Sequence, residues 1–276
     1  MHIEGRSNVR WLAVTGIGLL FAVVLGGDPR TATALPSPPS NWAVLIEHNS
    51  FSGRYPDLPV AYANSTRMLT VLTRRGWSPD HILLLRNDLD PILLQRSVGW
   101  LAARVRPGDT ALLYVASEYE WLDRNLGWDL VIPPLWRNLR TSRRVLIAEA
   151  CFAQRLADAV RGIAGVALPA VGRDEWDWWG VRETGKIMRG APFTYFLGRA
   201  LAAQPEGAPL DFAAAFPEAV AGAREYFRTV IATTPGALDS FHDRGSHPER
   251  LARFPNPHLV GGDETVEPAL QAASAP

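Results

Sequence analysis

The sequence has almost no cysteine and no excess of charge of either sign. Of its 276 residues only Cys151 is a cysteine, and 28 basic residues are balanced by 28 acidic ones. A single cysteine excludes an internal disulfide. Without an excess of basic side chains, the protein has little positive charge to neutralise the phosphates of a nucleic acid. We therefore expect no nucleic-acid partner. The hydrophobic share of 47% is ordinary for a globular chain with one sizeable core.

The sequence also lacks an apolar run long enough to predict a membrane-spanning helix near its start. The uncharged run Trp11–Leu25 is shorter than the roughly 20 residues that a span requires. Two arginines precede this run, and the small-residue pattern Ala32-Thr33-Ala34 follows it. This order predicts a signal peptide over residues 1–34, cleaved after Ala34, and an exported protein. An uncleaved N-terminal anchor is the alternative, and only that alternative predicts contact with a membrane.

After residue 34 the chain alternates short apolar runs with amphipathic stretches. Residues 35–40 are rich in proline and serine and are expected to be a linker, 41–262 a single domain, and 263–276 a disordered tail. Strands are predicted at 42–46, 81–85, 110–115, 144–150, 165–171 and 257–261, and helices at 60–75, 92–105, 133–139, 154–160, 193–203 and 212–230. Residues 117–129 are expected to be irregular. The alternation predicts an α/β fold, with a mostly parallel central sheet of about six strands and helices on both faces.

Three of these predicted strands end in residues that can carry chemistry. The first is followed by His48, the third by Glu118, and the fourth by Cys151. In open parallel sheets the carboxyl ends of such strands face the crevice where ligands bind. A buried core thiol is the ordinary role of a lone cysteine. In an exported protein an unpaired thiol risks oxidation or mispairing, which favours a functional role for Cys151.

The segment Glu149-Ala150-Cys151 resembles the nucleophile segment of legumain-type cysteine peptidases, which include the asparaginyl endopeptidases and the catalytic subunit of GPI transamidase. Residues 42–46 resemble the opening strand of that family, and residues 171–174 resemble the exit of its fifth strand; the matches span 41–205. The resemblance implies the caspase-like fold that this family shares with the caspases. It also implies a peptide or protein as substrate or ligand, Cys151 as the nucleophile, and Glu149 and Asp174 as substrate-binding residues.

The sequence departs from this family at the catalytic histidine. Glu118 stands at the position of that histidine, and Tyr119 at the position of the glycine that follows it. A carboxylate beside a thiol disfavours the thiolate that would act as nucleophile. Cys151 is followed by Phe152, where the family has a glycine that helps to leave N–H groups free for an oxyanion. These departures predict a pseudopeptidase that binds a peptide without cleaving it, or a divergent peptidase.

His48 leaves an alternative open, an active cysteine endopeptidase or transpeptidase that uses Cys151. The first strand is expected to lie beside the third, so the imidazole of His48 could act as a relocated base, oriented by Glu118 and facing Cys151. The other interpretation is a loop histidine with local hydrogen bonds. The spacing of these three residues matches no zinc motif, so neither a metal nor a cofactor is predicted. The tryptophan-rich run 176–179 is either an aromatic wall over the crevice, a surface for a partner, or a loop packed against the domain.

Overall fold

The computed structural model describes residues 38–51, 57–58, 60, 62–87, 89–180, 188–231 and 255–261. Within these residues one sheet is formed by β1 (Asn41–Glu47), β2 (Ile82–Arg86), β3 (Thr110–Ala116), β4 (Arg143–Glu149), β5 (Val166–Pro169) and β6 (Val260–Gly261). The strand order is β2-β1-β3-β4-β5-β6. Strands β1 to β5 run parallel, and β6 pairs with β5 antiparallel. The predicted signal peptide and the predicted tail lie outside the described residues.

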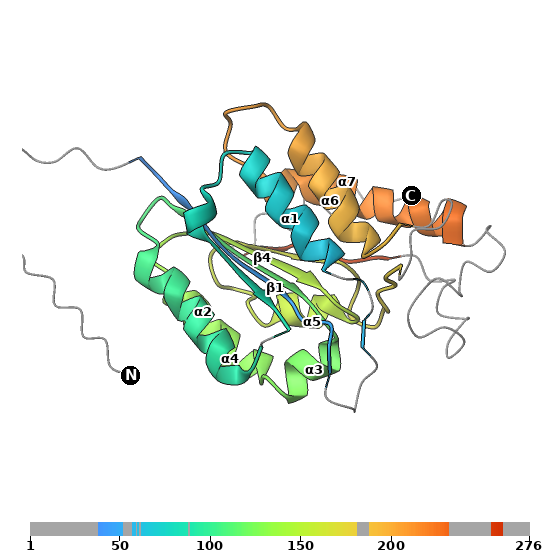
Figure 1. The fold of residues 1–276 in the computed structure, drawn as a ribbon, viewed down its shortest axis with the longest axis horizontal. Coiled ribbons are helices and arrows are strands. Elements are labelled where there is room, and N and C mark those ends of the chain that lie inside the picture. The colour runs from blue at the N-terminus through green and yellow to red at the C-terminus, as the bar shows by residue number, and fades with distance from the viewer. Residues whose placement is uncertain are drawn as a thin grey trace, which may run out of the picture. The chain divides into compact units, whose positions relative to one another are not determined.

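Helices cover both faces of this sheet, as Figure 1 shows. One face carries α1 (Ala63–Arg74), α6 (Pro192–Ala203) and α7 (Phe212–Tyr226). The other carries α2 (Pro91–Arg104), α3 (Tyr119–Arg124), α4 (Trp128–Arg137) and α5 (Ala153–Asp158). Two short turns, η1 (Pro79–His81) and the π-helical η2 (Phe227–Ile231), complete the described elements. The predicted α/β class with a mostly parallel sheet is therefore confirmed. Among the described residues, no helix is both long and apolar enough to cross a membrane.

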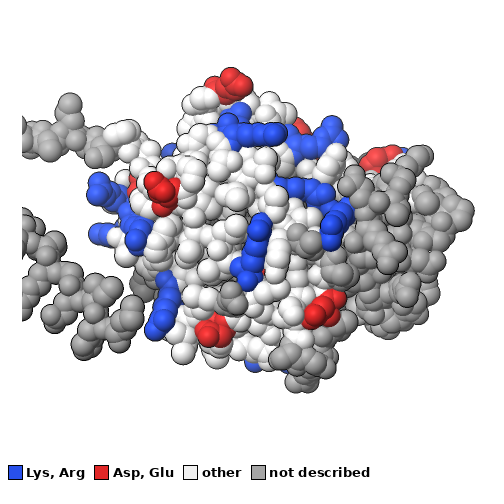
Figure 2. Space-filling model, viewed as in Figure 1, with Lys and Arg blue, Asp and Glu red and all other residues white. Residues whose placement is uncertain are grey.

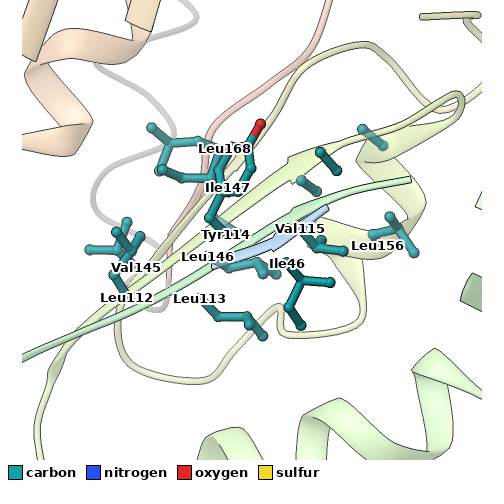
Figure 3. Packing of buried hydrophobic residues seen from close by; sticks show 14 of the residues in the cluster. Ile46, Leu112, Leu113, Tyr114, Val115, Val145, Leu146, Ile147, Leu156 and Leu168 are labelled. Carbon is teal, nitrogen blue, oxygen red and sulfur yellow. The ribbon is translucent and has the colours of Figure 1, made fainter. Parts of the chain in front are cut away.

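The core lies where the central strands are covered on both faces. All seven residues of β3 are buried, as are the last five of β1 and of β4. Figure 3 shows Leu112 and Val145 at one end of this packing, and Val115 beside Ile46 further along it. Strands buried on both faces need almost continuous apolar sequence, which is why these runs could be recognised without any alternation. Each fully buried aliphatic side chain contributes about 1.5–3 kcal/mol.

The prediction that residues 117–129 are irregular is wrong. This stretch forms α3 and the start of α4, which begins at Trp128 and not at 133. Gly127 separates the two helices with a left-handed backbone at φ 60°. The buried residues Trp128, Ile132 and Trp136 recur at every fourth position, so their burial against the sheet holds α4 together around its two internal prolines.

Other element boundaries shift by a few residues. His81 belongs to η1 and not to the second strand, and its ring stacks on Trp42 at 3.8 Å between centroids. The last predicted strand is reduced to Val260–Gly261, and the last predicted helix ends at Tyr226 before η2. The start of α2 is as expected, because the carboxylate of Asp90 accepts from the Leu93 N–H at 2.6 Å.

The surface in Figure 2 carries scattered positive charge on a largely uncharged background. The chain has one lysine, Lys186, which lies outside the described residues, so the basic side chains visible there are arginines. They are spread over this face and are not gathered into one stripe.

Candidate functional site at the carboxyl edge of the sheet

The carboxyl ends of β1, β3 and β4 meet at one edge. The register pairs Glu47 of β1 with Ala116 of β3, and Ala116 with Glu149 of β4. The His48 N–H extends this ladder by donating to the Ala116 carbonyl at 3.0 Å. The residues that follow the three strands are therefore brought to the same edge: His48, Glu118 and Cys151.

Consecutive side chains at the end of β1 point to opposite faces of the sheet. Glu47 points to α1, where its carboxylate accepts from the Ser65 N–H at 2.7 Å. His48 points to α3, where its ring stacks on Trp121 with 3.8 Å between centroids and 11° between planes. Phe51 packs edge-on against the same imidazole, with 5.1 Å between centroids. These contacts hold the buried imidazole of His48 against α3.

Cys151 lies directly after β4, and its side chain is almost covered. The residue is 6% exposed, and its thiol donates to the Asp177 carbonyl, with 3.8 Å between sulfur and oxygen. Phe152 takes a left-handed backbone, φ 55°, which is uncommon for a residue other than glycine. Its N–H donates to the Glu175 carbonyl at 2.8 Å. The Cys151 thiol and the Phe152 N–H therefore both donate hydrogen bonds to backbone carbonyls of the segment 175–177.

Two of the three remaining predicted residues, Glu118 and Asp174, lie at the rim of this edge. Glu118 is partly buried at the N-cap position of α3, but its side chain does not cap the helix. Asp174 forms an ion pair with Arg155 of α5 at 2.7 Å, and the Asp174 side chain is 72% exposed. An exposed pair of this kind contributes about 0–1 kcal/mol to stability.

Glu149 is the last residue of β4, and its buried carboxyl group interacts with that of Asp177, which the sequence did not single out. The side chains of Glu149 and Asp177 are both buried, and the Asp177 carboxyl is one of the groups that raise the pKa of Glu149. Glu149 Oε2 accepts from the N–H of Thr194, at 2.9 Å, and from its hydroxyl. The Asp177 carboxylate accepts from the indole N–H of Trp179.

Burial raises the pKa of the acids at this edge of the sheet. Burial, followed by the neighbouring Asp177 carboxyl, raises the pKa of Glu149 well above its usual range. Burial likewise raises the pKa of Asp177 and that of Glu47. The hydroxyl of Tyr114 lies 2.8 Å from Thr194 Oγ1, and burial together with Glu149 raises the pKa of Tyr114. The carboxyl edge thus contains a cluster of acids whose charged forms are disfavoured by desolvation.

Aromatic side chains form a wall beside Cys151. Phe152 packs edge-on against Tyr119, with 5.6 Å between centroids, and against Trp176 at 5.9 Å. The guanidinium of Arg155 lies over the rings of Tyr119 and Phe152, at 5.7 and 5.1 Å. All three aromatic residues are only partly buried, so the wall is accessible at the surface.

The tryptophan-rich run therefore combines two of its predicted roles. Trp176 belongs to the aromatic wall beside Cys151. Trp178 and Trp179 are buried and pack back into the domain.

Sequence reasoning missed Asp177, Thr194 and Trp121 as parts of this site. The sequence does contain a signal for Asp177, which is the single acid inside a run of tryptophans. If such a run is buried, its acid needs a polar partner inside the protein. Thr194 and Trp121 carry no comparable signal, since their roles depend on which face of the sheet their helices cover. Within the described residues, no three His, Cys, Asp or Glu side chains are grouped so that they could hold a metal ion.

The strand order, the parallel β1–β5 and the two helical layers define a caspase-like α/β fold. Among solved structures, the chain is similar to caspase-1 from Spodoptera frugiperda, with a TM-score of 0.51 over 81% of this chain and 86% of that chain. The sequence identity is 11%, so the similarity shows the fold alone. No protein-family model matches the chain, and no curated protein sequence matches it either.

Proposed function

We propose that this chain is an exported relative of the legumain- and caspase-type cysteine peptidases that binds a peptide or protein segment without cleaving it. One observation carries the proposal: the Cys151 thiol and the Phe152 N–H are both hydrogen-bonded to residues 175–177. A nucleophile must reach the substrate carbonyl, and an oxyanion needs free donors beside it. Here both groups are bound within the protein itself.

The residues around Cys151 support the same proposal. Glu118 stands where the resembling family has its catalytic histidine. A carboxyl group does not accept the proton of a thiol as an imidazole does, and a carboxylate beside the thiol disfavours the thiolate. His48, the relocated base of the alternative, is packed between Trp121 and Phe51 on the α3 side. An active peptidase would require this imidazole to accept the proton of the Cys151 thiol. The reactivity of that thiol therefore distinguishes the two functions.

The thiol of Cys151 is expected to react with iodoacetamide at pH 6 more slowly than free cysteine, because it is covered and bound to a carbonyl. His48→Ala should leave this rate unchanged, since the imidazole does not activate the sulfur. The rate can be followed by mass spectrometry of the full chain, alongside incubation with a mixed peptide library. Two results together would instead establish the active peptidase. Cys151 would react faster than free cysteine and lose this advantage in His48→Ala, and the chain would cleave peptides only when Cys151 is present.

The aromatic wall of Tyr119, Phe152 and Trp176 is the proposed contact surface for the ligand. Partly exposed aromatic rings supply a large contact area and dominate the energetics of many interfaces. The ligand is therefore expected to present apolar side chains to this wall.

Replacing Trp176 by alanine is expected to weaken peptide binding by about tenfold or more, as for a central aromatic contact residue. Peptides selected from a displayed library against the full chain would serve as probes, with affinity measured by fluorescence anisotropy. Trp100→Ala is the matched control, because Trp100 is also partly buried but belongs to α2 and packs on Trp42 and Arg104. Equal affinities of the two variants would place the binding surface elsewhere.

A further inference from the structure

A cavity of about 380 Å³ lies at the amino edge of the sheet, at the opposite end of β4 from Cys151. It is lined by the first residues of three strands, Thr110 of β3, Arg143 of β4 and Val166 of β5. Because β4 is seven residues long, about 20 Å separate the cavity from Cys151. The cavity has the volume of a small-molecule site and is separate from the proposed peptide-binding surface.

The floor of the cavity consists of side chains that share one face of the sheet. Residues paired in register in parallel strands present their side chains to the same face, and so do alternate residues of one strand. The register pairs Thr110 with Arg143, and Val145 with Val166. Arg143 and Val145 are alternate residues of β4, and all four residues line the cavity. The floor is therefore apolar toward the core and positively charged at its outer end.

Arg143 supplies the positive charge of this floor. The next residue, Arg144, points to the opposite face, where its guanidinium donates to the Leu139 carbonyl at 2.6 Å and to the Ala164 carbonyl at 3.1 Å. By the alternation along β4, the side chain of Arg143 extends on the cavity side. Within the part of the chain that the structure describes, the Arg143 guanidinium forms no hydrogen bond or ion pair. Its charge is thus available to a ligand.

The roof of the cavity is the connection between α6 and α7, and it is held in place by two side chains. Its apolar residues that line the cavity are Pro209, Leu210, Phe212 and Ala213. The Gln204 side chain donates to the Asp211 carbonyl at 2.6 Å and accepts from the Asp211 N–H at 2.9 Å. The guanidinium of Arg75 donates to the Pro205 carbonyl at 2.6 Å. A roof fixed in this way lowers the cost of ordering on binding.

Asp211 limits the charge that the cavity can accept. It lines the cavity, and its carboxylate accepts from the Ala214 N–H at 2.9 Å, so the amino end of α7 is already capped. The cation for an anionic ligand is therefore Arg143 and not the helix end. A ligand with several negative charges would be repelled by the Asp211 carboxylate, whereas a single negative charge can pair with Arg143.

We propose that this cavity binds a small carboxylic acid, with its carboxylate paired to the Arg143 guanidinium and its short apolar chain between the floor and the roof. The planar guanidinium matches a carboxylate in charge and in geometry. Ser142, which also lines the cavity, carries a hydroxyl that can donate to the same carboxylate. Val145 and Val166 of the floor, with the apolar residues of the roof, bury the chain.

Three probes separate the two features of this ligand: hexanoate, hexanamide and inorganic phosphate. Hexanoate has both the charge and the apolar chain, hexanamide lacks the charge, and phosphate lacks the chain. Each is titrated into the full chain at pH 7, and its dissociation constant is measured by nuclear magnetic resonance. We expect saturable binding of hexanoate. Hexanamide and phosphate should bind at least about tenfold more weakly, because each loses one of the two contributions.

Two variants locate the binding of hexanoate in the cavity. Arg143→Gln should weaken it by about tenfold or more, as for the loss of a hydrogen bond between charged groups. Ala213→Phe places a large side chain in the cavity from the first turn of α7 and should abolish binding. Arg96→Gln is the matched control, because Arg96 is another exposed arginine but belongs to α2 on the other face of the sheet. Circular dichroism checks that each variant is folded.

The proposal is overturned if hexanoate does not bind saturably, or if it binds equally well to the wild type and to Arg143→Gln. Hexanamide that binds as tightly as hexanoate would show a purely apolar cavity. Phosphate that binds as tightly would show a site for inorganic anions. Either result would also overturn the assignment of a carboxylic acid.

Discussion

Replacement of Trp179 by alanine is expected to lower the free energy of unfolding by about 3–5 kcal/mol, the range for removing a large aromatic side chain from a core. Trp179 is 1% exposed and belongs to the main hydrophobic core. Its indole N–H also donates to the Asp177 carboxylate, which would lose this partner inside the domain. The variant should therefore combine a cavity with a weakened contact beside Cys151.

Urea unfolding followed by far-ultraviolet circular dichroism would measure this loss. Trp176→Ala is the matched control, because it removes the same side chain three positions earlier, where the residue is only partly buried. Trp176→Ala should lower the free energy of unfolding by less than about 2 kcal/mol, because Trp176 buries less apolar area on folding than Trp179 does. Equal costs for the two variants would show that Trp179 is not the residue that anchors this segment.

The free energy of unfolding is expected to be higher at pH 5 than at pH 8. Burial raises the pKa of Glu149, Asp177 and Glu47 above the ordinary carboxyl value of about 4. The folded state therefore binds more protons than the unfolded state above that value. The stabilisation is complete below the ordinary pKa and is lost as the pH rises through each raised pKa, by up to about 1.4 kcal/mol per pH unit for each proton released on unfolding. The exposed ion pairs, which act in the opposite direction, contribute little.

Urea unfolding at pH 5, 6, 7 and 8 would measure this dependence. Glu149→Gln should reduce the slope, because it removes the most strongly shifted carboxyl of the buried pair. Glu218→Gln, which changes an exposed acid of α7, should leave the slope unchanged. A stability that increases from pH 5 to pH 8 would contradict the raised pKa values of Glu149, Asp177 and Glu47.

The central strands could be predicted from the sequence because both their faces are buried. The runs that became β1, β3 and β4 are continuously apolar, and this local property suffices to locate them. Their parallel arrangement follows from the helices between them, and it brings His48, Glu118 and Cys151 to one edge. The roles of these three residues remain predictions, and so does the legumain-type ancestry that Glu149-Ala150-Cys151 suggests.

Sequence reasoning failed where local pattern and tertiary packing differ. Residues 117–129 contain too many aromatic and polar residues to show a clear helical period, yet burial of Trp121 and Trp128 against the sheet makes two helices of them. Trp178 and Trp179 follow Asp177 immediately, but nothing local indicates that these rings turn inward and carry that acid with them. Long-range packing decides such cases, because the free energy comes from surfaces that are distant in the chain.

By itself, the sequence determined an α/β domain with one cysteine at the carboxyl edge of its sheet, since apolar runs and strand ends are local properties. Only the tertiary structure decided what surrounds that cysteine. It places the Asp177 carbonyl on the thiol, the Asp177 carboxyl against Glu149, and His48 against Trp121. The physical reason is burial: an unpaired polar atom removed from water is costly, and the fold determines which partners are within reach.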